Sequence, residues 1–278
     1  MIGIGLLRAE WMKITRQGTT RIVLGLLAGI SVLFVVGLTM SVTATQSGGE
    51  NPLLRQASFS RLGFPGGIFT GIDIIKNIGF FIVAIFFSSV IGSEYGLDTW
   101  KNLLVRHNSR SGFLAAKLLV TALALLVIFI ITVAIAQLVA LGGHALISDA
   151  ATQAGLITPV VSADQFFHTL VVQTIPLLLT YAVGAALAAM FTIITRTTVS
   201  GILLTVVWGI LDAAVSYFAP SVGDFTLDKN IASLGKYLDG VGSGDIPLWQ
   251  NLAVFGVYFL IPMVVAIVIF RRRDMAGN

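Results

Sequence analysis

The sequence predicts an all-α membrane protein with six transmembrane helices. Charged residues make up only 11 % of the 278 residues, against roughly 25 % in soluble domains. Apolar types reach 56 %, and the mean hydropathy is +0.94. With so few charged residues, a water-soluble fold of this composition would expose large apolar patches to water. Six apolar stretches are each long enough to cross a hydrocarbon core about 30 Å thick, which takes about 20 helical residues.

The expected spans are about 22–42, 68–91, 118–141, 169–195, 197–219 and 249–270. The uncharged part of the second span, 77–91, would reach only about 22 Å at 1.5 Å per residue, so we expect this helix to begin earlier and to include Asp73 and Lys76. Pro176 and Pro262 fall inside two spans, where neighbouring groups can satisfy the freed carbonyls.

Lysine and arginine are distributed unevenly between the two sides of these spans. The side that holds both termini carries twelve of the 17 basic residues, and the other side carries five. The positive-inside rule then predicts that both termini are cytoplasmic, in a multi-pass protein of the cell's inner or plasma membrane. We expect one membrane domain over 1–278, with no nucleotide-binding domain.

Several catalytic and binding chemistries have no motif in this sequence. Cysteine is absent, which excludes disulfides and thiolate metal sites. A phosphate-binding loop, a zinc-binding H-E-x-x-H pair and a G-x-S-x-G nucleophile turn are also missing. We therefore expect no catalytic residue, no metal and no cofactor in this chain. The basic residues flank membrane spans, so they do not indicate a nucleic-acid partner.

The N-terminal stretch predicts an amphipathic helix before the first span. Its apolar face consists of Ile4, Leu7, Trp11 and Ile14, and Lys13 and Arg16 lie away from that face. Tryptophan with basic residues next to a span favours a helix in the inner headgroup layer, in contact with membrane lipid, with Glu10, Trp11 and Lys13 as its candidate residues. A plain basic anchor for the first span is the alternative.

The long inner connection between the second and third spans predicts a short helix with a docking surface. Asp98 or Thr99 can cap that helix, and Trp100, Leu103 and Leu104 then form an apolar face beside charged residues. Such a helix can lie in the groove of a cytoplasmic partner. A solvated loop with a few interfacial residues is the alternative.

Two patterns together resemble a known family. The inner connection contains Glu94, Asp98-Thr99, Leu103-Leu104, Ser109-Arg110 and, opening the third span, Lys117, and the N-terminus contains Ala9-Glu10-Trp11-Met12-Lys13 with Arg16 and Thr20. These patterns resemble the permease subunits of ABC type-2 exporters, a superfamily of bacterial six-span proteins. Asp98 stands where glycine is usual, and the proline often found before Ser-Arg is missing.

The resemblance implies a permease subunit that forms the substrate path as a dimer with an identical or related permease. Separate ABC ATPase subunits would bind ATP and magnesium, and the cargo would be a peptide antibiotic, a drug, a lipid or a similar molecule. The implied ATPase-coupling residues are Glu94, Asp98, Thr99, Trp100, Lys101, Leu104, Arg106, Ser109 and Arg110. A non-transport membrane scaffold and an ion-driven secondary transporter are the alternatives.

Polar residues within the spans are candidates for the substrate path. Asp212 lies alone in the fifth span, where a charge costs up to about 2.5–3.5 kcal/mol at the bilayer centre. It either lines the path or is hydrogen-bonded to a neighbouring helix, for example through Ser216 or Thr205. In the second span Asp73 and Lys76 are spaced to pair.

With Asn77, Asp73 and Lys76 form either a path-lining group or an interfacial pair near the outer headgroups.

The outer connection before the last span predicts a short amphipathic helix, because Ile231, Leu234 and Leu238 recur at helical spacing. Small residues at 25 and 29, and at 184 and 188, predict close helix packing, either within the chain or between subunits.

Overall fold

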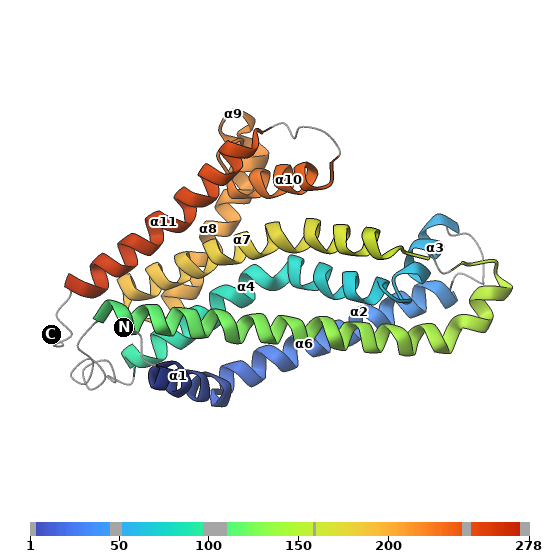
Figure 1. Cartoon of the computed structure of the whole chain (residues 1–278), viewed down its shortest axis with the longest axis horizontal. Helices are drawn as coiled ribbons and strands as arrows, with labels where there is room; N and C mark the ends of the chain where they lie inside the picture. Colours follow the sequence, from blue (N-terminus) through green and yellow to red (C-terminus); the bar gives the residue numbers. More distant parts are fainter. Residues whose placement is uncertain (1–3, 45–51, 97–109, 158–159, 241–245, 273–278) are drawn as a thin grey trace. The chain divides into compact units, whose positions relative to one another are not determined.

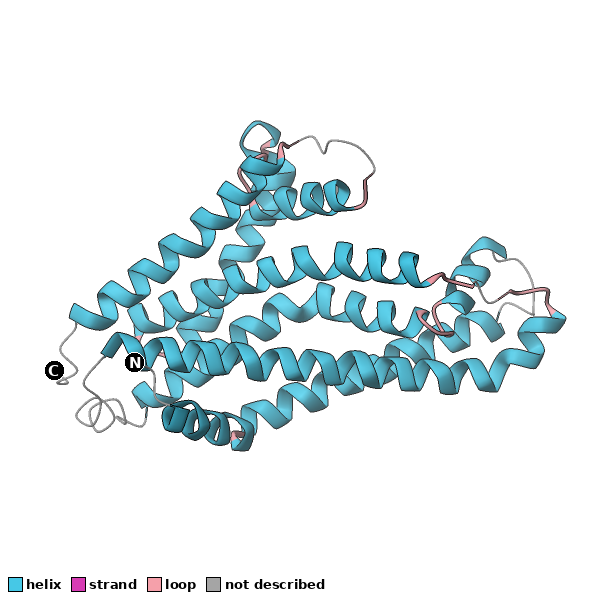
Figure 2. Cartoon of the chain, in the orientation of Figure 1, coloured by secondary structure: helices cyan, strands magenta, loops and turns pink. Residues whose placement is uncertain are grey.

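The computed structural model describes residues 4–44, 52–96, 110–157, 160–240 and 246–272. Within these residues the chain is all-helical and has no strand (Figure 2). The prediction of an all-α protein is therefore confirmed. The backbone hydrogen bonds of a membrane helix are satisfied within the helix itself, which is why such a sequence folds this way.

Figure 1 shows the helices in their order along the chain. They are α1 (Ile4–Arg16), α2 (Gly18–Ala44), α3 (Pro52–Ser60), α4 (Gly66–Gly96), α6 (Arg110–Gln153), α7 (Ala163–Thr195), α8 (Thr198–Phe218), α9 (Pro220–Gly223), α10 (Leu227–Leu238) and α11 (Leu248–Arg272). Six of these, α2, α4, α6, α7, α8 and α11, are long and apolar enough to cross a membrane. The prediction of six spans is confirmed among the described residues.

Five of the spans, α2, α4, α6, α7 and α11, extend beyond the predicted bounds, and α6 extends by the most. We expected a connection to begin at Gly142, but α6 continues to Gln153. Ile147 and Ala151 are buried in a cluster with residues of α2 and α3. This burial outweighs the weak helix propensity of Gly142 and Gly143. At 44 residues, α6 is about 66 Å long.

Helix α7 begins at Ala163 instead of near residue 169 because of a capping box. The Gln165 backbone N–H donates to Ser162 Oγ at 3.3 Å, and Gln165 Oε1 accepts from the Ser162 backbone N–H at 3.3 Å. Each side chain thus satisfies a backbone donor that the first helical turn leaves open.

The described chain divides into two compact units. Unit 1 contains 1–21, 78–125 and 172–278, and unit 2 contains 22–77 and 126–171. The core of unit 2 joins α2, α3 and α6 through Val35, Val42, Phe59, Leu62, Ala140, Ile147 and Ala151. Helix α3 was not predicted. The prediction of a single domain is not tested and stays a prediction.

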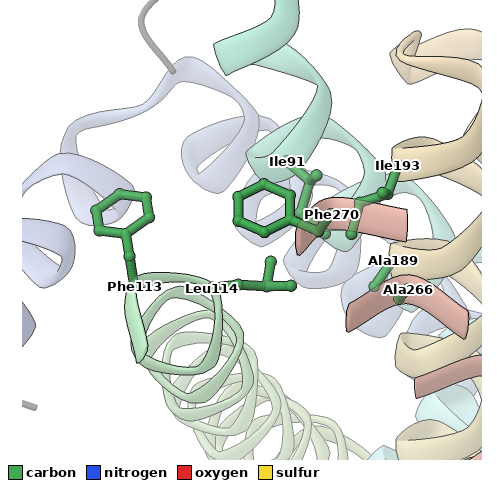
Figure 3. Packing of buried hydrophobic residues seen from close by; sticks show 7 residues of the cluster. All are labelled: Ile91, Phe113, Leu114, Ala189, Ile193, Ala266 and Phe270. Carbon is green, nitrogen blue, oxygen red and sulfur yellow. The ribbon is translucent and has the colours of Figure 1, made fainter. Parts of the chain in front are cut away.

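One apolar cluster of unit 1 gathers the ends of four helices. It consists of Ile91, Phe113, Leu114, Ala189, Ile193, Ala266 and Phe270, from α4, α6, α7 and α11 (Figure 3). In Figure 3 the side chains of Ile91, Leu114 and Phe270 face one another. Leu6 of α1 and Tyr95 of α4 pack against this cluster, which we call the junction cluster.

Helix α10 confirms the predicted short amphipathic helix. Leu234 is buried, and Ile231 and Leu238 pack against the same apolar cluster as Phe255 of α11. The helix contacts α8 and α11. Of the two small-residue pairs, Gly184 lies against Phe80 of α4 and so packs within the chain, whereas Gly25 and Gly29 have no neighbouring atom within 4 Å of an added Cβ.

Candidate functional site

Four charged side chains of unit 1 meet where α1, α4 and α6 come together. Lys117 Nζ donates to Glu94 Oε1 at 2.5 Å and to Glu10 Oε2 at 3.2 Å, and Lys13 Nζ donates to the same oxygen of Glu94. The exposed fraction is 0 % for Glu94 and Lys117 and 4 % for Glu10. Lys13 is half-buried. We call Glu10, Lys13, Glu94 and Lys117 the four-charge cluster.

Helical spacing places each buried charge beside the junction cluster. Ile91 precedes Glu94 by three residues on α4, and Leu114 precedes Lys117 by three residues on α6. Residues three or four apart share a helix face, so both helices present an apolar side chain and then a charge. Leu6 brings α1 to the same apolar residues.

The four-charge cluster contains two carboxylates and two ammonium groups. Removing a charge from water costs several kcal/mol per ion, and only close partners with good geometry offset that cost. Losing one partner of a buried pair costs about 3–5 kcal/mol, because a charge is then left uncompensated. The cluster therefore specifies which helix ends meet.

The predicted coupling residues fall into three groups according to where they lie. Glu94 is buried in the four-charge cluster, and not on an exposed surface. Asp98, Thr99, Trp100, Lys101, Leu104, Arg106 and Ser109 lie outside the described residues, and Arg110 opens α6. Contact of this segment with an ATPase is not tested and stays a prediction.

The predicted N-terminal helix is present as α1. Its location in the inner headgroup layer is not tested and stays a prediction. Of the predicted apolar face, Ile14 is buried and Trp11 is 36 % exposed. Lys13, expected away from the apolar face, reaches Glu94, and Glu10 is buried against Lys117. Ion pairing with α4 and α6 decided this orientation. The apolar pattern of α1 alone did not contain that information.

Asp212 of α8 caps the N-terminus of α10. Its carboxylate accepts from the backbone N–H groups of Leu227 at 3.1 Å and Asp228 at 3.0 Å, and from the Tyr258 hydroxyl of α11 at 2.8 Å. Thr226, at the N-cap position of α10, makes no side-chain capping bond. Asp212 thus satisfies open donors and places a negative charge at the positive end of the helix dipole.

The partners expected for Asp212 are engaged elsewhere. Thr205 donates to the Gly201 carbonyl at 2.8 Å, and Ser216 donates to Asp228 at 3.3 Å. The geometry explains why a carboxylate is tolerated at this position of α8. A role in the substrate path is not tested and stays a prediction.

Asp73 pairs with a different residue from the one predicted. Among the described residues its carboxylate lies 3.3 Å from Arg61 Nη1, and it makes no pair with Lys76. The Asn77 amide donates to the Asp73 carbonyl at 2.7 Å, and Lys76 and Asn77 are exposed. Arg61 follows α3, a helix that was not predicted, so its proximity to Asp73 could not be foreseen.

Two residues of these sites had no assigned contact in the sequence analysis. Lys117 was identified only as the residue opening the third span. A lysine beside an apolar run needs a partner, and Glu94, just beyond the inner end of the preceding predicted span, was one candidate carboxylate. Tyr258 lies 46 residues from Asp212 and gave no signal. Among the described residues, no three His, Asp or Glu side chains form a group that could hold a metal.

The comparison with known families identifies the chain. The family described as ABC-2 family transporter protein matches residues 6–212, which include the four-charge cluster and Asp212. The chain belongs to the ABC-2 transporter family. It is a multi-pass permease of an ABC transporter in the plasma membrane. No curated protein and no solved structure matches the chain.

Proposed function

We propose that this ABC-2 permease is the transmembrane subunit of an exporter, driven by a separate ABC ATPase. The family match over residues 6–212 is the observation that carries the proposal. Six apolar helices supply the membrane body. ATP and magnesium would bind to the partner ATPase, since the sequence contains no phosphate-binding loop.

In this proposal both termini are cytoplasmic, and α1 lies in the inner headgroup layer. The uneven distribution of Lys and Arg supports the orientation. On α1, Arg8, Trp11 and Arg16 are exposed, whereas Glu10 is buried. Basic and aromatic groups on the outer side of a helix suit contact with lipid headgroups.

The ATPase would contact the segment 97–109. Its mixture of charged and apolar residues suits docking into a partner's groove. The segment follows Glu94 and precedes Lys117, and these two residues are joined by a buried ion pair. Movement of the segment would therefore reach α4 and α6 directly.

Two permeases, identical or related, would form the substrate path between them. By family resemblance the cargo is a peptide antibiotic, a drug, a lipid or a similar molecule that leaves the cell. The α8 helix, of which only Gly201 and Thr205 are buried, leaves ample surface for lipid or a second permease.

The test is to co-express the chain with a candidate phosphate-loop ATPase, sought in the neighbouring reading frames, and to measure co-purification and ATP hydrolysis in lipid nanodiscs. We expect a stable complex whose hydrolysis requires both subunits. Arg106→Glu should reduce co-purification, whereas Lys236→Glu, an exposed residue of α10, should not. Equal co-purification of the two variants would exclude the proposed docking segment. ATP hydrolysis by the purified permease alone would refute the proposed division of labour.

Orientation can be tested separately, because the chain has no cysteine of its own. Single cysteines at exposed positions 272 and 239 should react differently with a membrane-impermeant maleimide in intact cells. We expect labelling at 239 and protection at 272. The reverse pattern would overturn the proposed orientation.

A further inference from the structure

We propose that the four-charge cluster is a rigid clamp, which makes α1 and the two helix ends flanking segment 97–109 move as one body during transport. This inference rests on the proposed ATP-driven function. Lys117 is the positioning residue of the clamp: it touches neither nucleotide nor cargo in this proposal, and it acts by holding other elements in place.

Lys117 joins three helices that are distant in the sequence. From α6 it reaches Glu10 of α1, 107 residues away, and Glu94 of α4, 23 residues away. Lys13 makes a second link between α1 and α4. An ion pair therefore joins α1 to α4, another joins α1 to α6, and a third joins α4 to α6.

Burial makes the two ion pairs of Lys117 rigid, whereas the Lys13 side chain is 38 % exposed. Separating them would leave charges in a site closed to water, because Lys117 and Glu94 are 0 % exposed and the junction cluster lies beside them. The pair between Arg61 and Asp73 provides the contrast. Its side chains are 47 % and 30 % exposed, so water can replace either partner at little cost.

The position of the clamp along the chain gives it a role in coupling. Segment 97–109 leaves the clamp after Glu94 and returns to it before Lys117, so a displacement of the segment acts on both residues. The clamp also includes α1, which a single residue, Gln17, separates from α2. A displacement at the proposed ATPase contact is thereby transmitted to the first span as well as to α4 and α6.

The test measures the distance between α1 and α6 with spin labels. Met12→Cys and Ala115→Cys are exposed positions on the two helices, and they are the only cysteines in the labelled chain. The complex with its ATPase is studied in nanodiscs, without nucleotide and with ATP and vanadate. We expect one narrow distance distribution that is the same in both states. A shift between the states in the otherwise native chain would overturn the proposal.

The matched variant is Glu10→Leu with Lys117→Met. It removes one carboxylate and one ammonium group together and keeps the pair between Lys13 and Glu94, so the net charge of the four-charge cluster is unchanged. We expect this variant to fold, to elute as a single species, and to show a broader α1–α6 distribution. An unchanged distribution would refute the clamp. Arg61→Met with Asp73→Leu removes the exposed pair and should leave the distribution narrow.

These experiments test the clamp proposal and the exporter proposal independently. A chain that binds no ATPase would refute the exporter proposal. In that case the nucleotide-free comparison of the native chain with Glu10→Leu/Lys117→Met would still decide whether the cluster holds the helices together.

Discussion

Replacement of Lys117 by methionine tests the buried cluster most directly. Methionine keeps an unbranched stem of similar length and a similar helix propensity, so the main loss is the charge. In the native chain two carboxylates face two ammonium groups. In Lys117→Met, the buried carboxylates of Glu10 and Glu94 both lose the ammonium group that they share.

The expected loss in the free energy of unfolding is about 3–5 kcal/mol, the usual cost of removing one partner from a buried ion pair. At about 1.4 kcal/mol for each factor of ten, the ratio of folded to unfolded protein falls by a factor of roughly 100–4,000. A part of the side chain's burial is kept by methionine, so lost apolar contact contributes little.

The assay is unfolding of the purified protein in mixed micelles with rising SDS, followed by tryptophan fluorescence and helical circular dichroism. Lys76→Met, at an exposed position of α4, is the control and should change stability by less than about 0.5 kcal/mol. Glu10→Leu/Lys117→Met should be more stable than Lys117→Met, because charge balance is restored. Equal stability of Lys117→Met and the native chain would refute the inference that these charges are withdrawn from water.

Three further predictions concern other contacts. Asp212→Ala should speed amide hydrogen exchange in α10 and cost about 0.5–2 kcal/mol, because the helix loses its cap, and unchanged exchange would contradict the capping role. Gly201→Ala should lower the free energy of unfolding, measured by thermal denaturation, by about 1–3 kcal/mol, since the added methyl group meets Thr192. The methyl group added by Gly256→Ala has no neighbouring atom within 4 Å, so this variant should not be destabilised. Asp73→Asn should change stability by less than about 1 kcal/mol in the same thermal assay, because its pair with Arg61 is partly exposed, and a larger loss would show that the pair is shielded from water.

Features that depend on averages along the chain could be predicted from the sequence. The six spans follow from hydropathy summed over about 20 residues, and α10 follows from three apolar residues at helical spacing. The family could be identified from motifs in the N-terminal stretch and around Glu94, and the match over residues 6–212 confirms it. None of these inferences requires knowledge of which helices are neighbours.

The sequence alone thus determined the class of protein, the number of spans and the family. Only the tertiary structure decided the contacts of the charged residues: Lys117 with Glu10 and Glu94, Asp212 with α10 and Tyr258, and Asp73 with Arg61. A span is apolar because of its own residues, whereas the partner of a buried charge depends on which helix packs beside it. In this chain those partners lie as many as 107 residues away.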